Sequence, residues 1–222
     1  MVGVAAKGEG MSEARQQILD RISRSTSQGR SAASYAQIPR DYLHLGLRDK
    51  KERVELMIER LREYDAEVAE CQPNDLPACI ADCLRASGKR IFVAPPGLPA
   101  DWLVHGFTWK VDHDLTHAAI EASDGVITTC SVGVADSGTI VLHHSPSEGR
   151  RIISLLPDWH LCILRVSQIV ETLPEYFALC KRLPRLATYI SGPSATADIE
   201  MTRIKGVHGP RFLHVIIVHD EA

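Results

Sequence analysis

The sequence predicts an α/β protein, in which a mostly parallel sheet is flanked by helices and preceded by an N-terminal helical extension. Two observations carry this prediction. From residue 49 onward, apolar residues at helical spacing alternate with short strand-like runs, a pattern typical of parallel sheets. The length of 222 residues also suits one α/β domain with an extension. We expect an extension and linker over residues 1–47 and an α/β domain over residues 48–222.

Composition and charge exclude several classes of protein. Hydrophobic residues at 45% and charged residues at 24% are ordinary for a globular chain. A net charge of −3 provides no general basic field for nucleic acid or an anionic membrane. The first residues lack the pattern of a secretory signal, and the most apolar region, residues 152–166, is too short and too interrupted to span a membrane. We therefore expect a cytoplasmic protein that binds no nucleic acid.

The N-terminal extension reads as one short helix followed by a linker. Residues 12–24 place Ile18, Leu19 and Ile22 on one side of a helix, with Ser12 as the N-cap. Residues 23–37 are rich in Ser, Thr, Gln and Gly and predict a linker or loop. The extension either docks on a partner or lies on its own domain, and the sequence leaves both open.

The first half of the α/β domain alternates helices with a buried strand. Apolar residues at 3.6-residue spacing predict a long amphipathic helix over residues 49–70, and a second helix follows over 75–86. Residues 89–94 predict a strand that ends at Pro95, and residues 115–122 predict a short helix.

The second half is richer in strands. Residues 125–135 and 139–143 are β-rich runs separated by a turn at 136–138, which predicts a hairpin or tight strand pair. Strands are further expected over residues 161–166, 187–190 and 212–219, and a helix over residues 173–182.

Cysteines and histidines do not form a recognisable metal or cluster motif. The six cysteines include no Cys-x-x-Cys, so we expect no iron–sulfur cluster in this chain, and no disulfides in a reducing cytoplasm. Cys79 and Cys83 share a helix face, where small buried apolar residues are the better interpretation. His113 and His117 share the spacing of a metal site but lack its glutamate, so no metal is expected. Because dinucleotide and P-loop fingerprints are missing, no tightly bound NAD, ATP or other cofactor is expected.

Residues 191–211 concentrate glycines, hydroxyls, carboxylates and an arginine between two apolar runs. Ser194 or Thr196 is expected to cap a following helix, whose free N–H groups would suit an anion. His208 lies between two glycines, where backbone approaches a ligand closely, and would act as a general base or as a donor to a carboxylate. An ordinary capped helix joined by turns is the alternative.

Two earlier turns carry similar chemistry. Residues 136–139 offer a carboxylate, two hydroxyls and turn amides, which either hold a small polar molecule or simply close an Asx turn. Arg150 follows the turn at 145–149 and is the best candidate anion anchor, with a solvated surface arginine as the alternative. We expect these loops to converge on a cleft at the carboxyl ends of the strands.

The candidate site therefore includes residues from all three segments. Asp198, His208 and Glu200 are candidate catalytic residues, although Asp198 and Glu200 lie two apart and would face different sides of a helix. The candidate ligand-binding residues are Asp136, Ser137, Gly138, Thr139, Ser145, Arg150, Ser191, Gly192, Ser194, Thr196, Asp198, Gly209 and Arg211.

Several polar blocks follow one another along the chain: residues 135–139, 145–150 and 154–158, the string Gly-Pro-Ser-Ala-Thr-Ala-Asp-Ile-Glu at 192–200, and the segment 206–210. In this order they resemble the LUD-domain family, and the resemblance covers residues 75–220. The resemblance implies a fold similar to the sugar-phosphate isomerase and CoA-transferase superfamily. It also implies an accessory subunit that acts with two iron–sulfur partner subunits in oxidising L-lactate to pyruvate. It implies no known chemical step for this subunit, and the glutamate nucleophile of the CoA transferases has no identifiable equivalent here.

The sequence leaves two functions open. The first is the accessory subunit, with a cleft for a small anionic ligand. The alternative is a free-standing enzyme acting on a phosphorylated sugar or a CoA ester.

Overall fold

The computed structural model describes residues 10–27, 37–180, 182, 184–197, 203–206 and 208–220. The chain divides into two compact units, Met1–Tyr42 and Leu43–Ala222. The first unit contains α1 (Gly10–Ser27), an amphipathic helix whose apolar residues Ile18, Leu19 and Ile22 are exposed. Because α1 begins at Gly10, Ser12 lies inside the helix and is not its N-cap. Among the described residues, no helix is long and apolar enough to cross a membrane.

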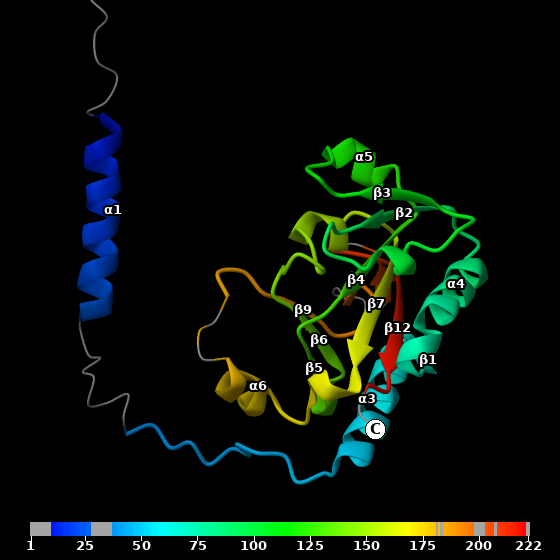
Figure 1. Cartoon of the computed structure of the whole chain (residues 1–222). Helices are drawn as coiled ribbons and strands as arrows, with labels where there is room; N and C mark the ends of the chain where they lie inside the picture. The colour runs from blue at the N-terminus through cyan, green and yellow to red at the C-terminus, as the bar shows by residue number, and fades with distance from the viewer. Residues whose placement is uncertain are drawn as a thin grey trace, which may run out of the picture. The chain divides into compact units, whose positions relative to one another are not determined.

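The second unit is built on a six-stranded sheet in which every neighbouring pair is parallel (Figure 1). The strand order is β1-β12-β7-β4-β2-β3. The predicted α/β class with a mostly parallel sheet is therefore confirmed. The strands are β1 (Glu67–Cys71), β2 (Ile91–Ala94), β3 (Thr108–Val111), β4 (Gly125–Thr129), β7 (Trp159–Arg165) and β12 (Phe212–Val218).

Helices cover both faces of this sheet. Successive side chains of β7 alternate between two cores, because side chains in a strand point to opposite faces. Cys162 and Leu164 pack with α3 (Lys50–Glu63), whereas Leu161 and Ile163 pack with α4 (Leu76–Ala86). The short α5 (His117–Glu121) contributes Ile120 to a third apolar cluster.

The long helix expected over residues 49–70 is wrong beyond residue 63. α3 begins with a capping box between Asp49 and Glu52 and ends at Glu63. Asp65 then takes a positive φ of 64°, which turns the chain into β1. Val68 matches the helical spacing by coincidence, because its strand is selected by parallel pairing with β12 near the end of the chain.

A second sheet of four strands has the order β8-β5-β6-β9. β5 and β6 form the expected antiparallel hairpin, but the run 125–135 divides between two sheets, since β4 belongs to the parallel one. The helix expected over 173–182 is shorter and ends at Leu179. The elements are β5 (Val132–Val134), η3 (Ala135–Ser137), β6 (Thr139–Leu142), β8 (Ile169–Val170), α6 (Leu173–Leu179) and β9 (Thr188–Ile190).

The segment after Ser194 is a strand, so the helix expected there is wrong. β10 (Ala195–Ala197) pairs with β11 (Arg203–Lys205) in an antiparallel ribbon, with Thr196 opposite Ile204. The ribbon satisfies backbone groups that a helix would have left free. The Ser194 N–H donates to the Pro210 carbonyl, and the Ser194 carbonyl accepts from Gly206. The remaining 3₁₀ turns are η1 (Pro73–Asp75), η2 (Ala100–Trp102), η4 (Arg151–Ser154) and η5 (Val166–Gln168).

Candidate functional site

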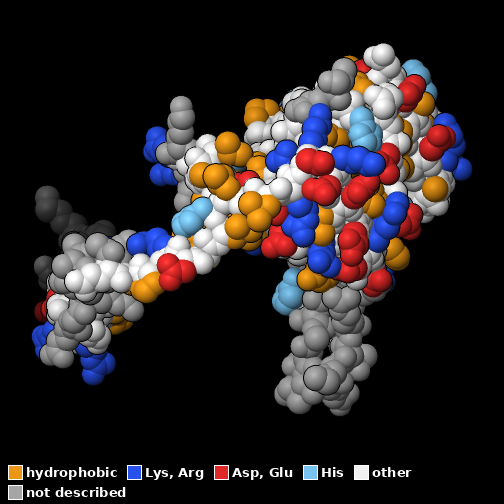
Figure 2. All heavy atoms as spheres, turned by 90° about the horizontal axis from the view of Figure 1, so that it is seen from below, with side chains coloured by type: hydrophobic (Ala, Val, Ile, Leu, Met, Phe, Trp, Pro, Cys, Tyr) orange, Lys and Arg blue, Asp and Glu red, His pale blue; other side chains and the backbone are white. Residues whose placement is uncertain are grey.

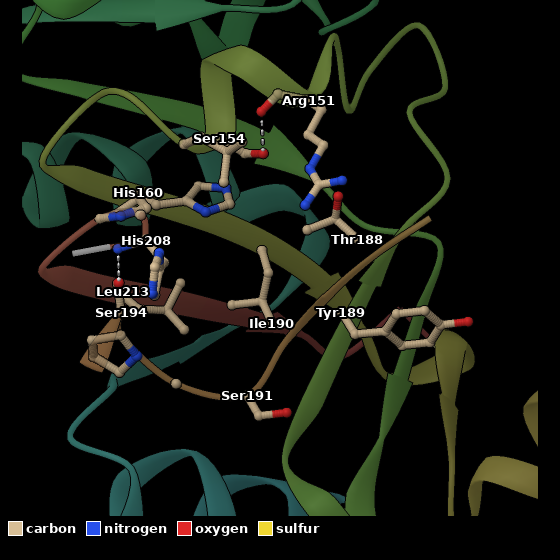
Figure 3. Close-up of a pocket in the computed structure, with 15 residues that line it drawn as sticks. Arg151, Ser154, His160, Thr188, Tyr189, Ile190, Ser191, Ser194, His208 and Leu213 are labelled. Atoms are coloured by element: carbon tan, nitrogen blue, oxygen red, sulfur yellow. Dashed lines mark hydrogen bonds between the residues drawn. The ribbon is translucent and has the colours of Figure 1, made fainter. Parts of the chain in front are cut away.

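A polar cavity of about 280 Å³ lies between η4, the chain that leaves β9, and the first residues of β7 and β12 (Figure 3). His160 and Leu213, the second residues of β7 and β12, both line it. The cavity therefore lies at the amino ends of these parallel strands. The expected position at the carboxyl ends is wrong for this cavity.

The lining is rich in hydrogen-bond donors and holds one guanidinium. Arg151 extends toward the hydroxyl of Thr188, and Ser154, Ser191 and Ser194 add three more hydroxyls (Figure 3). Among the described residues that line the cavity, none is Asp or Glu. A guanidinium with hydroxyls and without a competing carboxylate has the chemistry to hold a small anion.

Two histidines line the cavity, one buried and one exposed. His160 is 1% exposed, and its Nε2 lies 2.8 Å from the Thr128 hydroxyl. Burial lowers the pKa of His160 to about 4, so the ring is neutral at pH 7. His208 is exposed, and its backbone N–H donates to the Ser194 hydroxyl at 2.9 Å. His160 therefore offers a neutral imidazole, while His208 closes the loop over Ser194.

A hydroxyl chain joins two of the sequence-predicted segments. The Thr139 hydroxyl lies 2.7 Å from that of Ser137 and 2.7 Å from that of Ser191. Thr139 is buried and does not line the cavity, so it holds the cavity residue Ser191 from behind. Asp136 is exposed, and its backbone N–H donates to the Glu171 carbonyl.

The loop over residues 143–150 is held by a buried carboxylate. Glu148 accepts hydrogen bonds from the Ser131 hydroxyl and from the backbone N–H groups of His143 and Ser145. His144, with a φ of 59°, contacts the Gly149 carbonyl through Nδ1 and the Thr188 hydroxyl through Nε2. Ser145 thus belongs to a scaffold that positions Thr188 in the cavity wall.

Arg150 does not line the cavity, because carboxylates occupy its guanidinium. Its Nε and Nη2 donate to both carboxylate oxygens of Asp112 at 2.9 and 2.6 Å, and its Nη1 lies 3.1 Å from Asp114. Hydrogen bonding to Arg150 holds the pKa of the buried Asp112 carboxyl below its usual value. Arg211 is likewise paired with Asp158.

The structure thus brings together only part of the predicted site. Of the candidates, the cavity lining includes Ser191, Gly192, Ser194, His208 and Gly209. Asp198, Glu200 and the Thr196 side chain lie outside the part that the structure describes. Sequence reasoning missed Arg151, Ser154, His160 and Thr188, and the only signal was the position of Arg151 beside Arg150.

Three thiols meet between the end of β1 and α4. Cys79 contacts both Cys71, at the end of β1, and Cys83, one turn further along α4. Burial raises the pKa of Cys71 and of Cys83 to about 12, so these thiols stay protonated at pH 7. Within the described ranges, no group of three or more His, Cys, Asp or Glu side chains is arranged to hold a metal ion.

Fold and cavity together define an α/β protein with a parallel sheet and a polar cavity at the amino ends of two central strands. The model of the LUD domain matches residues 54–218, and the chain therefore belongs to the LUD domain family. A protein called lactate utilization protein C, from Deinococcus radiodurans, is 42% identical over 164 residues, which cover 72% of this chain and 76% of that protein.

Further relatives agree with this assignment. A lactate utilization protein C from Halalkalibacterium halodurans is 40% identical over 107 residues, covering 45% of this chain and 46% of that protein. The crystal structure of a DUF162 family protein from Deinococcus radiodurans matches with a TM-score of 0.65 and 34% identity. That match covers 78% of this chain and 99% of the crystallised chain.

Proposed function

We propose that this chain takes part in lactate utilisation as an accessory subunit that binds a small carboxylate in the polar cavity. One observation carries the proposal: Arg151, Thr188 and three serines line the cavity without a competing carboxylate among the described lining residues. The names of the relatives support lactate utilisation as the process. A 2-hydroxy or 2-oxo carboxylate, such as lactate or pyruvate, is the class of ligand that we propose.

Each part of such a ligand has a complementary group in the wall. The Arg151 guanidinium pairs with the carboxylate, and the hydroxyl of Thr188, toward which Arg151 extends, exchanges a hydrogen bond with the 2-oxygen. Leu155 and Leu213 offer apolar surface to the methyl group. The neutral His160 adds a polar atom without a charge, so Arg151 remains the cation that selects an anion.

We further propose iron–sulfur proteins as the partners. Oxidation of lactate to pyruvate releases two electrons and two protons, and an electron acceptor must take them. The described cysteines of this chain are free, and the thiols of Cys71 and Cys83 are held protonated, which does not suit a cluster ligand. We propose that clusters in partner subunits take these electrons.

Thermal unfolding with added L-lactate or pyruvate tests the cavity. Ligand that binds only the folded state raises Tm by mass action, worth about 2.7 kcal/mol at a concentration of about 100 times Kd. We expect a shift in the wild type that grows with the logarithm of ligand concentration above Kd and is lost in Arg151→Ala. Arg21→Ala is the matched control, because Arg21 is an exposed arginine on α1 and is not among the residues that line the cavity.

The competing outcomes are distinct. A shift that survives Arg151→Ala would contradict the proposed anchor. Co-purification of the chain with cluster-bearing proteins supports the accessory role. Turnover of a phosphorylated sugar or CoA ester by the purified chain alone would instead favour the free-standing enzyme.

A further inference from the structure

We propose that this chain has a second anion site, which binds the phosphate group of a small phosphomonoester. The site is a cavity of about 370 Å³ that we call the basic cavity. Its described lining consists of Arg85, Lys89, Arg90, His105, Phe107 and two glycines. No Asp or Glu is among these lining residues, and none of them lines the polar cavity. The proposal is therefore independent of the function proposed for the polar cavity.

The parallel pairing of β2 and β3 forms one side of the basic cavity. The two strands start side by side, with Ile91 opposite Thr108, and the Thr108 N–H donates to the Arg90 carbonyl at 2.9 Å (Figure 1). The segments that enter the two strands, 89–90 and 105–107, are therefore neighbours. Gly88, with a φ of 68°, turns the chain from the end of α4 into β2. The last turn of α4 thereby reaches the same cavity.

Arg90 is the central group of the basic cavity, because its guanidinium has no partner among the described residues. Asp124 lies close to its backbone, but this carboxylate accepts the backbone N–H groups of Arg90 and Ile91 at 2.9 and 2.8 Å. These two hydrogen bonds hold the pKa of the Asp124 carboxyl below its usual value. The backbone of Arg90 is thus fixed, while its exposed guanidinium is available to an anion.

The other two cations of the basic cavity have only weak carboxylate partners. Arg85 is paired with Asp82, and both side chains are exposed. The Lys89 Nζ lies 3.9 Å from Asp158, a carboxylate that already pairs with Arg211. Exposed ion pairs contribute little, because water screens both charges. An anion that enters the cavity can therefore compete for these cations at low cost.

A surplus of cations in one place differs from the mixed charge seen elsewhere on the molecule. On the face shown in Figure 2, Lys and Arg side chains are interleaved with Asp and Glu side chains. α3 has the same mixture, with the pairs Lys51–Glu55 and Arg60–Glu63. The net charge of the chain is −3, so the basic cavity is a local exception.

The dipole of α4 explains only part of this surplus. A cation in the last turn of a helix interacts favourably with the negative end of the helix dipole, which accounts for Arg85. Arg90 and His105 lie outside the helix, at the entrances to β2 and β3. Their presence in the same cavity is what indicates a bound anion.

The charge and size of the basic cavity favour a phosphomonoester. A phosphate ester carries a charge of about −1.5 to −2 at pH 7 and three acceptor oxygens, which suit a guanidinium and a second cation. The volume of about 370 Å³ falls in the range of about 300–1,000 Å³ that small-molecule sites occupy, so it leaves room for an organic group. Phe107, whose ring is held against Phe92 with centroids 5.6 Å apart, offers apolar surface to that group.

Isothermal titration calorimetry of the full chain with phenyl phosphate tests the site. This probe joins a phosphate to an apolar ring, and we expect a Kd below about 1 mM. Arg90→Ala should weaken binding at least about tenfold, because it removes charge-assisted hydrogen bonds. Its Tm without ligand should match that of the wild type, since the side chain is exposed. Arg62→Ala, which changes an exposed arginine of α3 outside both cavities, is the matched control and should bind like the wild type.

Further titrations separate the basic cavity from the polar cavity and phosphate from other anions. Arg151→Ala should bind phenyl phosphate as the wild type does, whereas a loss there would place the ligand in the polar cavity and overturn the proposal. Benzoate, which has a carboxylate in place of the phosphate, should bind at least about tenfold more weakly, because it carries a single charge. Equal binding of benzoate contradicts the phosphate class, and equal binding of inorganic phosphate contradicts the ester. Absence of phenyl phosphate binding, or binding that survives Arg90→Ala unchanged, overturns the site itself.

Discussion

His160 is a buried titratable group that stays neutral at pH 7. Its ring is buried at the start of β7 and contacts the Thr128 hydroxyl at 2.8 Å. Burial lowers the pKa of this histidine from 6.5 to about 4. In the unfolded chain the pKa of the same side chain lies near its ordinary value of 6.5. Between this value and about 4, the unfolded state therefore binds a proton that the folded state does not bind.

This difference makes stability depend on pH. The folded pKa is depressed, so the neutral ring contributes stability that is complete above the ordinary value of 6.5 and is lost as pH falls from there toward about 4. Between about pH 7.5 and about pH 5, we expect His160 alone to lower the free energy of unfolding by about 2 kcal/mol. Urea titrations at the two pH values measure how far the free energy of unfolding falls. The fall should be about 2 kcal/mol smaller in His160→Gln than in the wild type. His214, whose pKa burial also lowers, changes both proteins alike. Equal drops in the two proteins would contradict the assignment.

The adjacent residues Arg150 and Arg151 mark the limit of what could be predicted about the site. The sequence favoured Arg150 as the anion anchor, whereas Arg151 is the arginine that lines the cavity. Asp112, which forms an ion pair with Arg150, lies 38 residues earlier in the chain. No local sequence pattern indicates a pair between residues this far apart. Only the three-dimensional arrangement leaves Arg151 facing the cavity.

At the scale of elements, the hairpin of β5 and β6 is closed by a glycine that packs against α3. Gly138 has a φ of 58°, and a Cβ added there would lie 2.7 Å from the Cβ of Arg60 and 3.0 Å from its backbone carbon. The sequence analysis included Gly138 among the candidate ligand-binding residues. The close approach of the turn backbone to the α3 backbone explains why a glycine is needed at this position.

Two alanine substitutions separate packing from backbone conformation. Gly138→Ala should cost about 2–4 kcal/mol of unfolding free energy, from the left-handed conformation together with the clash. Gly88 has a similar φ of 68° but nothing within 4 Å of an added Cβ, so Gly88→Ala should cost only about 1–2 kcal/mol. Denaturant unfolding of both variants measures the difference. Equal losses would show that the contact with α3 does not matter.

Elements with strong local patterns could be predicted, and those defined by distant partners could not. α4, β7 and β12 carry continuous apolar patterns and were expected within a few residues of their observed bounds. β1 was absorbed into a helix and β3 was not expected, because both are edge strands chosen by pairing with strands elsewhere in the chain. A helix was expected at β10 because Ser194 and Thr196 are residues that often cap helices. The segment instead forms an antiparallel ribbon with β11, a partner that no local pattern indicates.

At the scale of the whole molecule, the described core belongs to the second unit. Every apolar side chain that the structure describes as buried lies between Val54 and Val218. The capping box at Asp49 and the contacts of Gly46 and Arg48 also lie within Leu43–Ala222. The unit thus carries its own core and the start of its first helix.

Two truncations test whether this unit folds alone. A chain beginning at Leu43 should keep its Tm within about 4 °C of the full chain, which corresponds to about 1 kcal/mol for a domain of this size. A chain beginning at Val54, where the match to the family model starts, removes the capping box and the first turn of α3 and should be clearly less stable. Calorimetry of the two chains measures this. Equal stability of the two truncated chains would show that residues 43–53 are dispensable.

The position of β12 has a consequence for how the protein is made. This strand pairs with β1 on one side and β7 on the other, yet residues 212–218 are synthesised after all the other strands of the sheet. A chain in which β12 has not yet paired therefore has open strand edges at β1 and β7. Open strand edges can pair with other chains, so the folding intermediate that lacks β12 is the form of this unit most exposed to aggregation.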